Sequence, residues 1–232
     1  MSTAAILVAA GQSRRMGFDK LFAELGSAPV LAHSLSTFQK AGCIDEIIVV
    51  TSDDKLSMIA DWTHDHGLTK LTKVIPGGSL RHLSVMEGLK AVHPKTKFVA
   101  VHDGARPLLA VSDLERCCKL AKTHGAAACA RRITDTVKRV DGNHRVTGSV
   151  DRTKLWAMET PQIFDLQLLK SAYDFVCTQN ALVTDEVSAA EFLGEAVHLS
   201  ETLKPNLKIT FPQDLELATQ LLAMSDKPSC SS

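Results

Sequence analysis

The sequence predicts an α/β protein in three layers, with a mainly parallel sheet covered by helices on both faces. Short buried-strand patterns such as EIIVVT at 46–51 alternate along the chain with longer segments whose apolar residues recur at helical spacing. Repeated strand–helix–strand units of this kind imply parallel strands joined by right-handed crossovers. With 232 residues, 45% of them hydrophobic, the chain can form one principal domain with a sizeable core.

The individual elements are predicted from local signals. An apolar run at 6–10 ends at Gly11, Pro29 opens an amphipathic segment, and Asp53 with Asp54 and Ser112 with Asp113 suit helix starts. Predicted strands occupy 6–10, 46–51, 74–75, 98–101, 126–130 and 206–210. Predicted helices run over about 29–42, 53–67, 79–92, 112–125, 165–178, 184–193 and 212–224, with Pro212 at the first helical position of the last.

Residues 131–158 break this alternation. They combine polar and β-branched residues with the turn sequence Asp141-Gly142-Asn143, which predicts a hairpin arm over about 136–158. A lone hairpin is at best marginally stable in water, so we expect the arm to pack against a second subunit, giving a homodimer. The domain is expected to span 1–224, arm included, and residues 225–232 to form a disordered tail.

Composition narrows the function classes. Lys plus Arg and Asp plus Glu both number 26, so no overall field favours nucleic acid or an acidic membrane surface. Neither a secretory signal nor a membrane-length apolar run is present, which predicts a cytoplasmic protein without a membrane partner. Six cysteines without a CxxC pair indicate reduced thiols, with neither a disulfide framework nor a zinc site.

The stretch AAILVAAGQSRRMGFDK at 4–20 predicts a buried strand followed by a phosphate-binding loop. Gly11 allows backbone N–H groups to approach an anion, while Arg14, Arg15 and Lys20 place cations in a short loop. The loop has neither the GxxxxGK[ST] nor the GxGxxG pattern of the common phosphate motifs. Taken alone, it fits equally well a strand-to-helix turn whose basic residues face water.

Later stretches of the sequence help to decide between a phosphate-binding loop and a turn whose basic residues face water. The stretch HDGARP at 102–107 follows a predicted strand, so its aspartate and arginine should lie beside the opening loop at the carboxyl edge of the sheet. Arg152, the TDE at 184–186 and Lys208 place further polar groups after turns or strand starts. Each alone is typical of a surface ion pair, a helix cap or a solvated lysine, and only their combination favours a site.

These stretches resemble one family. LVAAGQSRRMGFDK, PGGSLRHLSVMEGL, VHDGARP, TDTVKRV, VDRTKLWAMETPQ, TDEVSAAEFLG and NLKITFPQDL together resemble the 2-C-methyl-D-erythritol 4-phosphate cytidylyltransferases of non-mevalonate isoprenoid biosynthesis, across essentially the whole chain. The resemblance implies a Rossmann-like fold of the nucleotide-diphospho-sugar transferase type. It also implies transfer of a cytidylyl group from CTP to 2-C-methyl-D-erythritol 4-phosphate, giving 4-diphosphocytidyl-2-C-methyl-D-erythritol and pyrophosphate.

The resemblance also implies roles for particular residues. The implied catalytic residues are Arg15, Lys20, Arg152 and Lys208. The implied nucleotide-binding residues are Ala9, Ala10, Gly11, Gly78, Ser84 and Asp103. The implied residues around the ribose and the polyol phosphate are Asp103, Arg106, Thr136, Arg152, Thr160, Thr184 and Lys208. No metal-ligating side chain is expected, and the implied Mg²⁺ would be held mainly by the phosphates of CTP.

Two departures from the family pattern stand out. Ser79 lies where some members have an acidic residue, which leaves its contact with the base open, and Gly104 replaces the alanine of the commoner HDAARP. Three alternatives also stay open at this point. Ribitol 5-phosphate cytidylyltransferases share the fold, molybdenum-cofactor guanylyltransferases share a similar opening loop, and a non-catalytic nucleotide-binding protein would have lost some of the cations.

Overall fold

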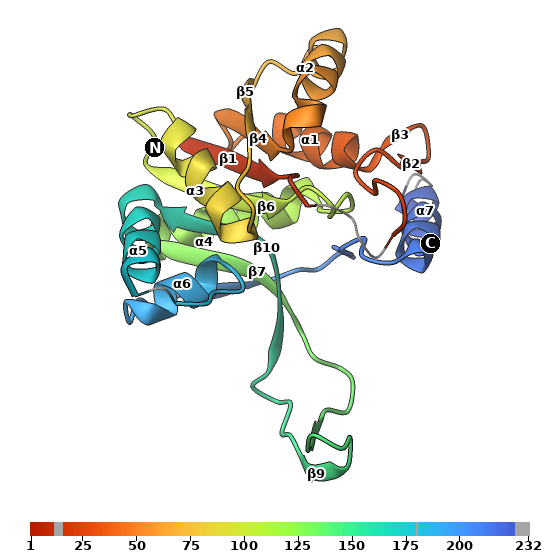
Figure 1. Ribbon diagram of the computed structural model, residues 1–232, viewed down its shortest axis with the longest axis vertical. Coiled ribbons are helices and arrows are strands. Elements are labelled where there is room, and N and C mark those ends of the chain that lie inside the picture. Colours follow the sequence, from red (N-terminus) through yellow and green to blue (C-terminus); the bar gives the residue numbers. More distant parts are fainter. Residues whose placement is uncertain (12–15, 180, 226–232) are drawn as a thin grey trace, which may run out of the picture.

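The computed structural model describes residues 1–11, 16–179 and 181–225, and its centre is one seven-stranded sheet. The strands are β1 (Thr3–Val8), β4 (Glu46–Thr51), β5 (Leu71–Pro76), β6 (Phe98–Asp103), β7 (Ala126–Arg132), β10 (Trp156–Asp165) and β11 (His198–Glu201), in the spatial order β11-β7-β10-β6-β1-β4-β5 (Figure 1). Only β10 runs antiparallel to its neighbours, β6 and β7. The predicted α/β class with a mainly parallel sheet is therefore confirmed.

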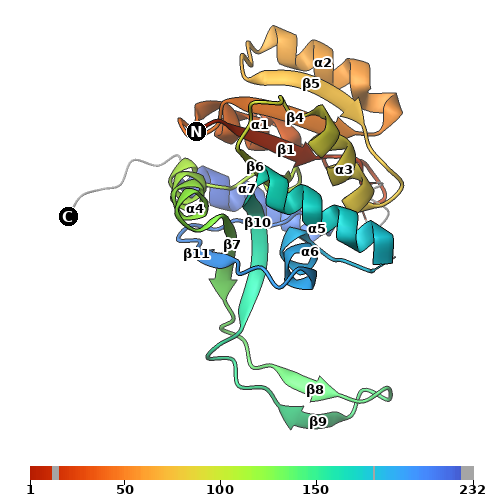
Figure 2. The same ribbon diagram turned by 90° about the vertical axis from the view of Figure 1, so that its left-hand side faces the viewer.

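Helices cover both faces of this sheet, as predicted. One face is covered by α1 (Val30–Lys40), α2 (Leu56–Asp65) and α4 (Val111–His124), and the other by α3 (Arg81–Ala91), α5 (Leu166–Gln179) and α6 (Glu186–Phe192) (Figure 2). Alternation along β1 explains the two cores: Ala5 and Leu7 point to the first layer, while Ala4 and Ile6 point to the second.

A smaller cluster lies beside the sheet. The last helix, α7 (Pro212–Ser225), packs with the short hairpin β2 (Glu24–Leu25) and β3 (Ala28–Pro29). A single 3₁₀ turn, η1 (Asp53–Lys55), precedes α2. The predicted start of α7 at Pro212 is confirmed, and the predicted tail beyond 225 lies outside the described residues.

The helix α3 lies unusually close to β1, which gives a testable prediction. A Cβ added at Gly88 would lie 2.6 Å from Cγ2 of Ile6, a fully buried side chain. Overpacking costs about 1–3 kcal/mol, against about 1 kcal/mol that alanine gains over glycine in a helix. The difference between the two terms leads us to expect that Gly88→Ala lowers the free energy of unfolding by up to about 2 kcal/mol in urea titrations.

Gly142→Ala is the matched control, because no neighbouring heavy atom lies within 4 Å of its added Cβ. It should change the free energy of unfolding by less than about 0.5 kcal/mol. A Gly88→Ala protein about 1 kcal/mol more stable than the unchanged chain would contradict the close packing of α3 on β1, because alanine would then show its full helix advantage over glycine.

One predicted strand is absent from the structure, and one observed edge strand was not predicted. Residues 206–210 do not form a strand: the segment runs extended beside the sheet, Ile209 N donates to Ala105 O (2.9 Å), and Ile209 packs in the cluster with α7. The parallel edge strand beside β7 is β11, whose short sequence HLSE contains a single aliphatic residue and gives no apolar run. The apolar side chains at 206–210 pack in the cluster with α7 and not in the core of the sheet.

The arm is present, with other boundaries than predicted. The hairpin β8 (Lys138–Val140) and β9 (Val146–Ser149) projects from the end of the sheet where β7 and β10 lie (Figures 1 and 2). Residues Trp156–Met158, predicted as arm, already pair with β7 as the first part of β10. The prediction missed β10 as a sheet strand because its sequence, WAMETPQIFD, mixes polar residues and a proline.

Two further observations concern the chain as a whole. Cys43, Cys117, Cys118, Cys129 and Cys177 are all free thiols, and Cys230 lies outside the described residues. In the described part of the chain, no helix has the length and apolarity to cross a lipid bilayer.

Candidate functional site

A cavity of about 580 Å³ opens at the carboxyl ends of β1 and β6. This is where ligands bind in open α/β sheets, because the connecting loops diverge there. Its described lining residues are Val8, Ala9, Ala10, Gly11, Met16, Lys20, Leu21, Gly78, Ser79, Leu80, Arg81, Ser84, Asp103, Ala105, Lys208 and Thr210. The segment after β1, the loop before α3, the end of β6 and the extended segment before α7 therefore meet at one place.

The two loops over this cavity approach each other closely at Gly77. A Cβ added there would lie 2.7 Å from both Ala10 Cβ and Ser84 Oγ. The Gly78 N–H donates to Ser84 Oγ (3.1 Å), so the buried hydroxyl holds the loop before α3 in place. Gly77 is needed because any side chain would separate the loop from Ala10.

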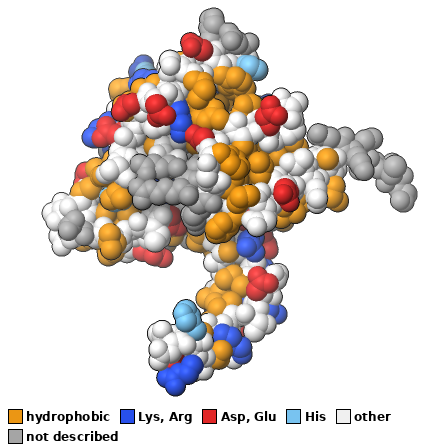
Figure 3. All heavy atoms as spheres, turned by 45° about the vertical axis from the view of Figure 1, so that its right-hand side comes forward, with side chains coloured by type: hydrophobic (Ala, Val, Ile, Leu, Met, Phe, Trp, Pro, Cys, Tyr) orange, Lys and Arg blue, Asp and Glu red, His pale blue; other side chains and the backbone are white. Residues whose placement is uncertain are grey.

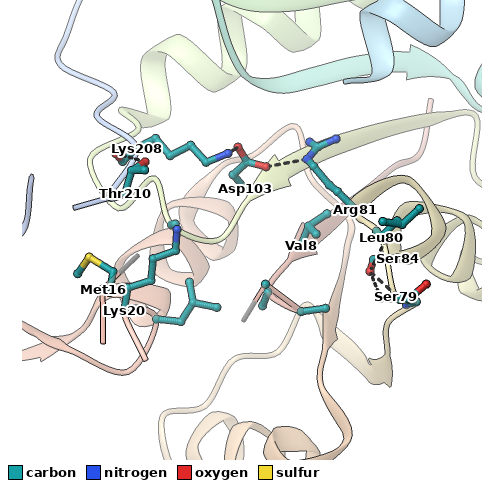
Figure 4. Close-up of a pocket in the computed structure, with 16 residues that line it drawn as sticks. Val8, Met16, Lys20, Ser79, Leu80, Arg81, Ser84, Asp103, Lys208 and Thr210 are labelled. Atoms are coloured by element: carbon teal, nitrogen blue, oxygen red, sulfur yellow. Dashed lines mark hydrogen bonds and ion pairs between the residues drawn. The ribbon is translucent and has the colours of Figure 1, made fainter. Parts of the chain in front are cut away.

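The polar side chains that line this cavity differ between its two ends. In the view of Figure 4, Lys20, Lys208 and Thr210 lie at one end, Ser79, Leu80 and Ser84 at the other, and Arg81 and Asp103 between them. Lys20 Nζ donates to Ile209 O (2.8 Å), which ties this cation to the segment that carries Lys208. Arg14 and Arg15, predicted in the same loop as Lys20, lie outside the described residues.

Asp103 is the centre of a charge cluster at the end of β6. Arg81 Nε lies 3.1 Å from Asp103 Oδ1, and Lys208 Nζ lies 2.7 Å from Oδ2, as Figure 4 shows. Burial by itself would raise the pKa of Asp103, but the charges of Arg81 and Lys208 outweigh it and hold that pKa well below its usual range. Asp103 is therefore an ionised carboxylate at neutral pH, held by cations on both sides.

A second, smaller cavity of about 210 Å³ adjoins the first. Its lining residues are Arg81, Asp103, Arg106, Met158, Glu159, Thr160, Gln162, Thr184, Asp185 and Lys208. Arg81, Asp103 and Lys208 line both cavities, so this cluster forms their common wall. Arg106 donates from Nη1 to Asn206 O (2.7 Å), while its buried Nε has no hydrogen-bond partner and lies 3.7 Å from Asp103 Oδ2.

A hydrogen-bond network between β6 and β10 holds the end of β6, which carries Asp103, in position. Thr160 Oγ1 accepts from Asp103 N (3.1 Å) and lies 3.0 Å from His102 Nδ1. Burial lowers the pKa of His102 to about 4, so the ring is neutral at pH 7. Its Nε2 faces the carbonyl of Arg106 (3.3 Å), which can only accept, so Nδ1 accepts from Thr160. Thr160 is thus fixed to β6 from the neighbouring strand β10.

Most of the predicted site residues meet at these two cavities. The first cavity is lined by Ala9, Ala10, Gly11, Lys20, Gly78, Ser84, Asp103 and Lys208, and the second by Asp103, Arg106, Thr160, Thr184 and Lys208. Thr136 and Arg152 line neither. Both are exposed in the segments that connect the β8–β9 hairpin to the sheet, where Arg152 Nη1 donates to Thr134 O of the same chain.

The sequence interpretation missed Arg81, which lines both cavities. One signal could have indicated it: it is the first residue of a helix that follows the Gly77-Gly78 loop at the carboxyl edge of the sheet. Glu186, which pairs with Arg81, is noted in the sequence only as part of the TDE stretch at 184–186. Among the described residues, no group of three or more His, Cys, Asp or Glu side chains could hold a metal ion.

Comparison with known proteins gives one consistent family. A family model described as IspD, 2-C-methyl-D-erythritol 4-phosphate cytidylyltransferase, matches residues 3–224. The chain is 36% identical over 230 residues to the protein of that name from Halalkalibacterium halodurans, covering 98% of this chain and 100% of the relative. It is 39% identical over 219 residues to the one from Dehalococcoides mccartyi, covering 94% and 95%.

Solved structures of proteins with this family's activity in their names have the same fold. The crystal structure of 4-diphosphocytidyl-2C-methyl-D-erythritol synthase from Anaerococcus prevotii matches with a TM-score of 0.85 at 30% identity, covering 96% of this chain and 98% of that one. The Francisella tularensis 2-C-methyl-D-erythritol 4-phosphate cytidylyltransferase matches with a TM-score of 0.80 at 30% identity, covering 95% and 100%.

Proposed function

The chain belongs to the 2-C-methyl-D-erythritol 4-phosphate cytidylyltransferase family, and from this premise we propose that its two adjoining cavities hold CTP and the polyol phosphate for direct transfer. The chain is a nucleotidyltransferase. The observation that carries the proposal is the common wall of Arg81, Asp103 and Lys208, which separates a cavity of about 210 Å³ from an adjoining one of about 580 Å³.

The larger cavity suits a nucleoside triphosphate. Its hydroxyl-bearing end, with the Gly78 backbone and Ser84, would face the base, and its cationic end, with Lys20 and Lys208, would face the phosphates. The backbone at Ala9, Ala10 and Gly11 would form the phosphate cradle after β1. Arg15, in the adjoining loop, would add a further cation.

The smaller cavity suits the polyol phosphate. Arg106 lines this cavity and Lys208 lies in the same wall, so both would bring positive charge toward the phosphate of the ligand. Thr160 and Thr184 bring side-chain hydroxyls to this cavity, of the kind that can bind the alcohol groups of a polyol. Asp103 would orient ribose or polyol hydroxyls, because its carboxylate is ionised and fixed by Arg81.

The reaction then needs no general base. The second pKa of a phosphate monoester is about 6, so at neutral pH the attacking oxygen is already an anion. This oxygen forms a bond to the α-phosphorus of CTP while the bond from that phosphorus to the bridging oxygen breaks, and pyrophosphate leaves. The protein contributes in-line positioning and fixed cations that stabilise the growing negative charge, chiefly Arg15, Lys20, Arg152 and Lys208.

Magnesium fits this site as an ion bound mainly by the triphosphate. Asp103 is the one carboxylate among the described residues that line the larger cavity, and both of its oxygens are paired with Arg81 and Lys208. The described lining residues therefore offer no set of oxygen ligands for Mg²⁺ by themselves, and the ion would bind through substrate phosphates, as it commonly does. When bound, the ion would neutralise phosphate charge.

We also propose that the arm forms a homodimer and carries Arg152 into the site of the partner. The arm stands clear of the body and exposes apolar and basic side chains (Figure 3), among them Val140 and Val146, which are 53% and 65% exposed. A two-stranded hairpin with exposed valines needs a packing partner. Arg152 and Thr136 line neither cavity of their own chain, which fits a role in a neighbouring one.

The cellular location that fits these features is the cytoplasm. Five cysteines are free thiols, and Cys117, Cys118 and Cys129 among them are buried, as is usual where the environment keeps thiols reduced.

Nucleotide and acceptor choice test the proposed function. In a pyrophosphate-release assay with 2-C-methyl-D-erythritol 4-phosphate, we expect CTP to be used at least about a hundredfold better than GTP or ATP, because a base edge that leaves buried polar groups unpaired is rejected strongly. Ribitol 5-phosphate with CTP is the matched acceptor control and should react far more slowly. Equal use of GTP would support the guanylyltransferase alternative, and preference for ribitol 5-phosphate would support the other cytidylyltransferase.

A further inference from the structure

Glu186, the first residue of α6, is a fully buried carboxylate directed toward the site. Its Oε1 accepts from Arg81 Nη1 (2.7 Å) and from Tyr173 OH (2.9 Å), and its Oε2 accepts from Arg81 Nη2 (3.1 Å). The side chain is 0% exposed, and it does not line either cavity. Glu186 therefore cannot touch a substrate in this structure, although its partner Arg81 lies in the wall between the cavities.

The backbone around Glu186 is held rigidly. Asp185 is the N-cap of α6 and forms a capping box with Ser188. Gln162 on β10 donates from Nε2 to Asp185 Oδ2 (2.9 Å) and accepts from Val187 N (3.0 Å). The start of α6 is thus attached to the central sheet, which gives the carboxylate of Glu186 a defined position.

All three nitrogens of the Arg81 guanidinium bind a carboxylate oxygen. Both terminal nitrogens bind Glu186, and Nε binds Asp103 Oδ1 (3.1 Å). A forked, planar pairing of this kind fixes orientation as well as charge, which a lysine could not do. The Arg81 side chain is 28% exposed, so without Glu186 it would be free to turn toward the phosphates of a bound nucleotide.

The same contacts continue to a proposed catalytic lysine. With Oδ1 bound by Arg81, the other oxygen of Asp103 faces Lys208 Nζ at 2.7 Å. The four side chains form a continuous chain of ion pairs, Glu186 to Arg81 to Asp103 to Lys208, from the buried start of α6 to the cavities.

We propose that Glu186 is a positioning residue of the nucleotidyl transfer: by binding both terminal nitrogens of Arg81, it sets the orientation of Asp103 and the place of Lys208 between the two cavities. This inference rests on the proposed function, since it assigns Glu186 a part in that reaction. It separates the TDE stretch into three tasks: Thr184 lines the smaller cavity, Asp185 caps α6, and Glu186 orients Arg81.

The test compares two substitutions that each remove one interaction of the buried Glu186 carboxylate. Glu186→Gln removes its charge and weakens the hold on Arg81, whereas Tyr173→Phe removes a hydrogen bond to Glu186 and leaves the pair with Arg81 intact. We expect Glu186→Gln to lower kcat by roughly tenfold to a hundredfold with KM for CTP changed less than about threefold, because a misplaced group at the reacting centre can cost about a hundredfold. Tyr173→Phe should leave kcat within about threefold of the unchanged enzyme. A normal kcat for Glu186→Gln, or equal losses in both variants, would overturn the proposal.

A double substitution shows whether Glu186 acts through Arg81. If it does, Glu186→Gln combined with Arg81→Gln should be no slower than Arg81→Gln alone, within about threefold. Losses that multiply would mean that the two residues act independently. Should Glu186→Gln fail to fold, Glu186→Asp keeps the charge but is one methylene too short for the forked pairing, and a kcat within threefold of normal in that variant would overturn the proposal.

One measurement does not depend on turnover. In a crystal structure of the Glu186→Gln enzyme, we expect Arg81 to have left Asp103 and Lys208 Nζ to have moved. Unchanged positions of both would overturn the inference even if the reaction proved to be another one. Absence of turnover in the unchanged enzyme, by contrast, would count against the proposed function alone.

Discussion

Replacement of Lys20 with alanine is expected to lower kcat by roughly a hundredfold to a thousandfold, the usual loss when one preorganised donor to a developing charge is removed. Lys20 lines the cationic end of the larger cavity, and its Nζ is held by Ile209 O at 2.8 Å. A cation fixed in this way can stabilise charge on the triphosphate without reorganising during the reaction. Steady-state kinetics with CTP and 2-C-methyl-D-erythritol 4-phosphate measure the effect.

The same variant separates chemistry from folding. Loss of the hydrogen bond to Ile209 should lower the free energy of unfolding by only about 1 kcal/mol. Lys90→Ala is the matched control, since Lys90 is an exposed lysine on α3 paired with Glu87, and it should leave both kcat and stability nearly unchanged. Near-normal turnover of the folded Lys20→Ala enzyme would show that this lysine does not serve the reaction.

Mixing two inactive variants is expected to restore activity if the arm reaches a neighbouring chain. In Arg152→Ala the arm is defective, and in Lys20→Ala the cavity is defective. In a mixed dimer with exchanged arms, one site would have both residues intact and the other would lack both. Random exchange makes half of the dimers mixed, so up to roughly a quarter of all sites should become active.

The controls for this experiment are each variant alone under the same exchange conditions. Subunit exchange itself is followed by an affinity tag on one variant, so that mixed dimers can be isolated and assayed directly. Isolated mixed dimers without activity would show that Arg152 serves its own chain. A protein that stays monomeric at all concentrations would remove the basis for the shared site.

Continuous apolar runs located buried strands from local pattern, although the run predicted at 6–10 corresponds to β1 over Thr3–Val8. EIIVVT forms β4 over the same residues as predicted, and the helix starting at Pro212 was placed correctly. Predictions failed where a strand is polar or where apolar residues belong to another core. β10 was missed because its polar residues satisfy partners inside the fold: Thr160 binds His102, and Gln162 binds Asp185. The segment 206–210, predicted as a strand, does not join the sheet, because Ile209 packs with α7 instead.

By itself, the sequence predicted the α/β class and a ligand site at the carboxyl edge of the sheet, because these depend on local patterns and on the rule that parallel strands end at one edge. Its resemblance to the family indicated further residues that line the two cavities, among them Ser84, Thr160 and Lys208. Only the tertiary structure decided which charges meet. Glu186 and Arg81 lie more than a hundred positions apart in sequence, and their forked pairing behind Asp103 exists because α6 and α3 cover the same face of the sheet. Long-range ion pairs leave no local trace in sequence, since either partner alone has the pattern of an ordinary surface charge.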